Sequence, residues 1–72
     1  MNLQTTIYKH VLYPKYVKIY LLIEELSRNS RLAINISYKK DIVNLLADII
    51  VIKDKYNIDC KEDYKLITKY KM

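Results

Sequence analysis

The longest regular pattern of apolar residues covers residues 41–56 and predicts a helix with little polar surface. At about 100° per residue, its main apolar face carries Ile42, Leu45, Leu46, Ile49, Ile52 and Tyr56. A second apolar face carries Val43, Ala47, Ile50 and Val51. Because a helix that is apolar almost all round must be buried on several sides, we expect a second chain or a partner to cover the second face.

Two further helices are predicted by the same periodicity, at residues 14–30 and 60–71. Pro14 suits the first turn of a helix, where its missing N–H costs nothing. The spacing of Asp59 and Glu62 is that of a capping box. Asn57 is expected to take the left-handed conformation that ends the long helix. Residues 1–13 fit either a short helix or an ordered arm.

Residues 31–37 alternate between apolar and polar positions, which predicts a half-buried strand. Leu32, Ile34 and Ile36 point one way, and Arg31, Ala33, Asn35 and Ser37 point the other. A lone strand leaves its backbone groups unpaired, so it should pair with the N-terminal arm or with the same strand of a second chain. The long helix then covers residues 38–56.

The predicted fold is mainly α, with three helices and one short strand in a single small domain over residues 1–72. We expect an intertwined homodimer, because a chain of this size buries only about 60% of its unfolded surface and is marginal alone. Its predicted interface comprises Leu32, Ile34, Val43, Ala47, Ile50 and Val51. An all-α helical bundle is the alternative.

Composition narrows the chemistry. With one cysteine and one histidine, no intramolecular disulfide can form and a four-ligand zinc site is not expected. With no glycine, the chain lacks a glycine-rich phosphate loop. We therefore expect a non-enzymatic protein without cofactor or metal. The longest apolar run, residues 45–52, is far below the roughly 20 residues of a membrane span.

The chain shows no signal-peptide pattern, which predicts a cytoplasmic protein. Its richness in isoleucine, tyrosine, lysine and asparagine suggests an AT-rich gene of a virus or mobile element.

The order strand, helix, turn, helix over residues 31–71 resembles the ribbon–helix–helix family of DNA-binding proteins. The resemblance implies that residues 31–37 form a ribbon with a second chain and enter the major groove. Arg31, Asn35 and Ser37 would then point to base edges, as arginine suits guanine and asparagine suits adenine. Lys39 and Lys40 are candidates for phosphate contacts.

Simpler interpretations stay open. The polar side of residues 31–37 and the lysines can be an ordinary solvated surface, and a helix-turn-helix or a tyrosine surface for single-stranded nucleic acid are further alternatives. The net charge of +5 favours polyanions.

Two hypotheses follow. One is a dimeric DNA-binding transcription regulator that contacts double-stranded DNA. The other is a protein-interaction module that binds a host or partner protein through exposed apolar helix faces, including Val17 and Leu21.

Overall fold

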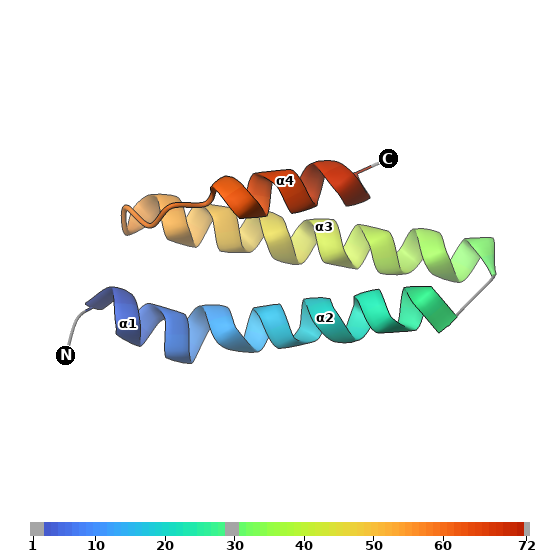
Figure 1. Ribbon diagram of the computed structural model, residues 1–72, viewed down its shortest axis with the longest axis horizontal. Coiled ribbons are helices and arrows are strands. Elements are labelled where there is room, and N and C mark those ends of the chain that lie inside the picture. The colour runs from blue at the N-terminus through green and yellow to red at the C-terminus, as the bar shows by residue number, and fades with distance from the viewer. Residues whose placement is uncertain (1–2, 29–30, 72) are drawn as a thin grey trace.

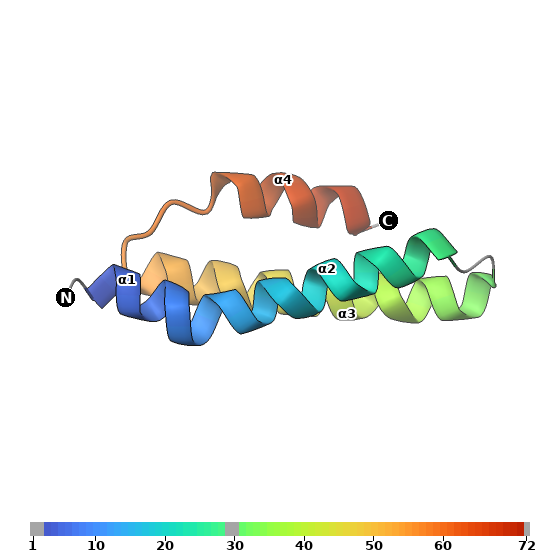
Figure 2. The same ribbon diagram turned by 60° about the horizontal axis from the view of Figure 1, so that its bottom comes forward.

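The computed structural model describes residues 3–28 and 31–71, except for the side chains of Leu32 and Ala33. Its elements are α1 (Leu3–Ile7), the π-helical turn η1 (Tyr8–Leu12), α2 (Tyr13–Arg28), α3 (Leu32–Lys55) and α4 (Lys61–Tyr70). The first three follow one another as one long helix, which runs antiparallel to α3 (Figure 1). Turned by 60°, α4 lies above this hairpin along α3 (Figure 2). The mainly helical prediction is confirmed, with no strand in the described ranges.

The long N-terminal helix passes through Pro14 because η1 widens just before it. The Tyr13 N–H donates to the Tyr8 carbonyl, five residues back instead of four. Proline has no N–H to give, and its ring crowds the carbonyl four residues earlier, here that of His10. A π turn is a known way to relieve such crowding. The N-terminal segment, expected as a short helix or an arm, is therefore helical over Leu3–Leu12, and Pro14 does not start a separate helix.

The predicted strand at residues 31–37 is wrong. Only Arg31 is extended, with φ −77° and ψ 120°, and α3 begins at the next residue. The Asn35 N–H already donates to the Arg31 carbonyl at 3.0 Å, as in a first helical turn. A helix satisfies its backbone groups within itself, whereas a strand here needs a neighbour. The ribbon required by the ribbon–helix–helix resemblance is thus helix in this chain.

The core lies between the long N-terminal helix and α3. Its fully buried side chains are Leu12, Ile19, Ile42, Leu46 and Ile49. Three of these belong to the predicted main face of the long helix, which is therefore confirmed as core. Side chains of α4, including Leu66, Ile67 and Tyr70, are partly buried against it.

The turn between α3 and α4 is a Schellman motif. The Ile58 N–H donates to the Lys53 carbonyl at 2.8 Å, and the Asn57 N–H to the Asp54 carbonyl at 3.3 Å. Asn57 has φ 57°, which confirms the predicted left-handed residue. Asp59 Oδ1 then accepts a hydrogen bond from the Lys61 N–H at 3.1 Å, so the aspartate side chain pairs with the first backbone N–H of α4.

Candidate functional site

A buried polar network joins the three longest helices. Lys53 Nζ on α3 lies 2.6 Å from Asp63 Oδ2 on α4. The Tyr16 hydroxyl on α2 donates to Asp63 Oδ1. Lys53 is 5% exposed and Asp63 is 4% exposed, so this ion pair is almost completely removed from water. The three side chains thereby fix α4 against the hairpin of α2 and α3.

Two aromatic rings complete the surroundings of the Lys53 ammonium. Nζ lies 5.4 Å from the centre of the Tyr8 ring and 5.3 Å from that of the Tyr16 ring. At such distances the ring faces attract a cation. The lysine charge is therefore balanced by one carboxylate and by two π surfaces, one from η1 and one from α2.

The environment holds both the phenol and the ammonium in their protonated forms. Burial, together with the hydrogen bond to Asp63, raises the pKa of Tyr16 to about 12. Burial alone lowers the pKa of Lys53, but its interactions with Asp63 and Tyr16 outweigh this effect and raise that pKa above its usual value. Neither group exchanges protons near neutral pH, so the network fits a structural role better than acid–base catalysis.

Sequence reasoning missed this network, although the spacing contained the signal. Lys53 comes four residues after Ile49 on the buried side of α3. Asp63 comes three residues before Leu66 and four before Ile67 on the inner side of α4. Two opposite charges, each placed on a core-facing row, are a sign that they are paired.

The predicted nucleic-acid residues lie around the N-terminal end of α3, but not in one outward row. Arg31, Ser37, Lys39 and Lys40 are exposed, whereas Asn35 is half-buried. Asn35 Oδ1 is buried and accepts no hydrogen bond from any described residue. Because Asn35 shares the inner side of α3 with Ile42 and Leu46, the base-reading trio is not brought together.

The predicted dimer-interface residues divide into two groups. Ala47 and Val51 are exposed, while Ile34, Val43 and Ile50 are half-buried. The side chain of Leu32 lies outside what is described. The dimer itself stays a prediction. Ala47 and Val51 belong to a row of exposed side chains along α3. This row, here called the outer α3 face, comprises Ile36, Lys40, Ala47, Val51 and Lys55.

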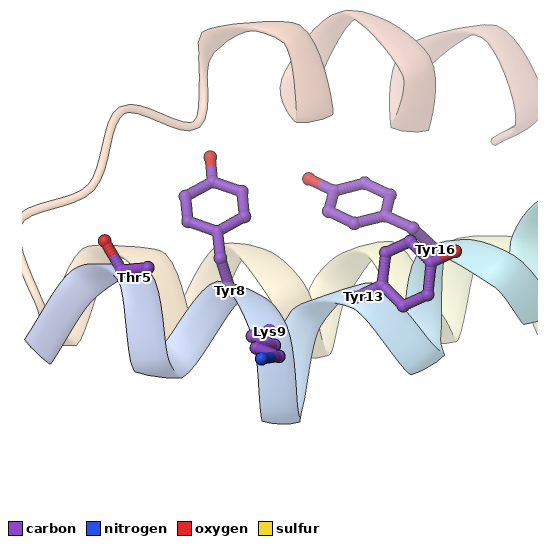
Figure 3. Close-up of a pocket in the computed structure, with 5 residues that line it drawn as sticks. All are labelled: Thr5, Tyr8, Lys9, Tyr13 and Tyr16. Carbon is purple, nitrogen blue, oxygen red and sulfur yellow. The ribbon is translucent and has the colours of Figure 1, made fainter. Parts of the chain in front are cut away.

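A second exposed apolar surface lies on α2, away from the core. This outer α2 face consists of Tyr13, Val17, Tyr20 and Leu21. At its N-terminal end is an open apolar hollow of about 620 Å³, lined by Thr5, Tyr8, Lys9, Tyr13 and Tyr16. In Figure 3, Tyr8 and Tyr16 point toward α4, unlike Lys9 and Tyr13. The hollow therefore adjoins both the buried network and the outer α2 face.

Within the described ranges, no group of three or more histidine, cysteine or acidic residues is placed to hold a metal ion. The helices described are too short or too polar to cross a membrane. Comparison with protein-family models, with curated proteins and with solved structures finds no match to this chain.

Proposed function

We propose that this protein is a non-enzymatic binding module that holds a partner protein on its outer α3 face. The observation that supports this function is the exposure of apolar side chains along α3: Ile36 is 58% exposed and Val51 is 67% exposed. Ala47 lies between them and is also exposed. Rows of exposed apolar groups on a small domain are typical of interaction surfaces.

The lysines on this face suit carboxylates of a partner. Lys40 and Lys55 are both exposed and lie on either side of Ala47 and Val51 along α3. An amphipathic helix that lays its apolar side on Ala47 and Val51, with carboxylates toward its two ends, matches both properties.

Affinity capture tests the proposal. The wild-type protein and a Val51→Asp variant are immobilised and exposed to extract of the source cells. Tyr64→Asp is the matched control, because Tyr64 is also an exposed apolar residue but lies on α4. A protein retained by wild type and control, but lost with Val51→Asp and reproduced with purified components, supports the function. Equal retention by all three overturns it.

DNA binding is the second candidate, supported by the net charge of +5 and by the exposure of Arg31, Lys39 and Lys40 at one end of α3. Without the ribbon, this proposal rests on phosphate contacts alone. It predicts binding to random duplex DNA whose affinity falls with added salt, by a slope of about 0.9 per neutralised phosphate. A Lys39→Glu, Lys40→Glu double variant should bind more weakly. Absence of a shift at low salt contradicts it.

A further inference from the structure

The outer α2 face is exposed, whereas Ile19 of the same helix is completely buried. Tyr13, Val17 and Leu21 follow one another at intervals of four residues, so they lie on successive turns of one side. Tyr13 is 66% exposed and Leu21 is 57% exposed. A helix side with this much exposed apolar surface on successive turns is typical of a contact with another helix.

The two ends of this face carry opposite charges. Lys9, eight residues before Val17, is exposed and lines the same hollow as Tyr13. Glu24 and Glu25 follow Val17 by seven and eight residues and are also exposed. Both carboxylates share Arg28, at 2.5 Å and 3.8 Å. One guanidinium offsets one of the two negative charges, so the C-terminal end stays acidic.

We propose that the outer α2 face packs against the same face of a second copy of this chain, antiparallel, with a two-fold axis beside Val17. Val17 then meets its own counterpart. Tyr13, four residues before the axis, meets Tyr20 and Leu21, which are three and four residues after it. At the ends, Lys9 of each copy meets the two glutamates of the other. Every contact occurs twice, as a two-fold interface requires.

The hollow provides a place for one side chain of the second copy. Lys9 and Tyr13 line this hollow and, unlike Tyr8 and Tyr16, do not point toward α4 (Figure 3). In the antiparallel register, Leu21 of the second copy arrives beside Tyr13, at the edge of the hollow. A leucine side chain suits the apolar lining of this open site. The tyrosines around it add aromatic contact to each half of the interface.

The outer α3 face belongs to a different helix from the outer α2 face. Self-association on α2 therefore leaves the outer α3 face available, and it does not depend on the function proposed for that face.

Sedimentation equilibrium of the full chain and its variants tests the inference. Val17→Glu places two carboxylates at the axis and should weaken the dimer about 100-fold. Lys9→Glu, and separately Glu24→Lys with Glu25→Lys, should each weaken it about 10-fold at low salt. A variant that combines Lys9→Glu, Glu24→Lys and Glu25→Lys should restore most of the affinity. Lys39→Glu is the control, because it makes the same charge change on exposed α3.

Circular dichroism verifies that each variant stays folded. We expect this because every changed side chain is exposed, and the least exposed large apolar one, Val17, is still 39% exposed. Val51→Asp should leave the dimer unchanged, which separates this inference from the partner site on α3. A wild-type chain that stays monomeric at roughly 100 µM overturns the inference. So does a dimer that tolerates Val17→Glu, or a charge swap that fails to recover affinity.

Discussion

Lys53 Nζ and Asp63 Oδ2, 2.6 Å apart, join α3 to α4 where water hardly reaches. Removing two charges from water costs several kcal/mol per ion, and their attraction offsets this only with good geometry and further partners. Here the Tyr16 hydroxyl supplies a hydrogen bond and two rings face the ammonium. The ion pair therefore adds a specific contact to the partly buried apolar side chains through which α4 packs.

Asp63→Ala should destabilise the fold by about 3–5 kcal/mol, because it leaves the Lys53 ammonium buried without its counterion. Urea denaturation followed by circular dichroism measures the loss. Asp54→Ala is the control, since Asp54 is an exposed aspartate on the neighbouring turn, and its effect should stay within about 0.5 kcal/mol. Equal losses in the two variants would contradict the role given to the ion pair.

Replacing both partners should be milder than replacing one. A Lys53→Met, Asp63→Leu double variant removes both charges and keeps apolar volume in their place. Such exchanges of a buried pair are often neutral or stabilising by about 1–4 kcal/mol. The double variant is therefore expected to be more stable than Asp63→Ala in the same urea titration. If the double variant is less stable than the wild type, the polar contacts contribute more than their desolvation costs.

Tyr16 should make stability fall in alkali. Its pKa rises from 10.0 to about 12 in the folded chain, so above pH 10 the unfolded chain loses this proton first. The contribution is complete below pH 10.0 and is lost as the pH approaches about 12. The raised pKa of Lys53 acts in the same direction.

Tyr16→Phe keeps the ring and removes the hydroxyl, which should cost about 1–2 kcal/mol at neutral pH. The variant should also show a shallower decline of stability with alkaline pH, measured by denaturation at a series of pH values. Tyr64→Phe, at an exposed tyrosine on α4, serves as the control. An unchanged pH dependence in Tyr16→Phe would count against the linkage.

Asn57 should distinguish glycine from alanine. With φ 57°, alanine at this position is strained by about 1 kcal/mol or more, whereas glycine adopts the angle freely. We expect Asn57→Ala to lower the thermal midpoint and Asn57→Gly to preserve or raise it. The opposite order in a melting experiment would be inconsistent with the Schellman turn.

Leu12→Ala should show that the N-terminal segment belongs to the core. Leu12 is completely buried, and such a truncation typically costs about 2–5 kcal/mol. Leu3, at 61% exposure on α1, gives the matched control, and Leu3→Ala should change stability by about 0.5 kcal/mol or less. Denaturation of both variants makes the comparison.

The helices and the main core row were predictable because apolar spacing is a local property of the chain. Ile42 and Ile49 were assigned to the core from their spacing alone, and both are fully buried. The left-handed Asn57 was predictable for a similar reason, since a helix end without glycine needs another residue that tolerates positive φ.

The strand at residues 31–37 was mispredicted because seven alternating residues are too few to separate two periods. In the helix Ile36 is 58% exposed, whereas the predicted strand would have placed it on the half-buried side. The buried network was missed for another reason. Lys53 and Asp63 are ordinary charges when each is read alone, and only the Schellman turn between them brings one opposite the other.

The π turn at Tyr8–Leu12 has the effect of one residue inserted into an α-helix. Pro14 and that surplus residue therefore form a coupled pair of sequence changes. If one residue is deleted and the proline is kept, the proline ring again crowds the carbonyl four residues earlier. If only the proline is replaced, the extra residue of the π turn remains. Only both changes together restore an unbroken α-helix with α1 and α2 in their present phase, so the N-terminal helix accepts a deletion at this position only with loss of the proline.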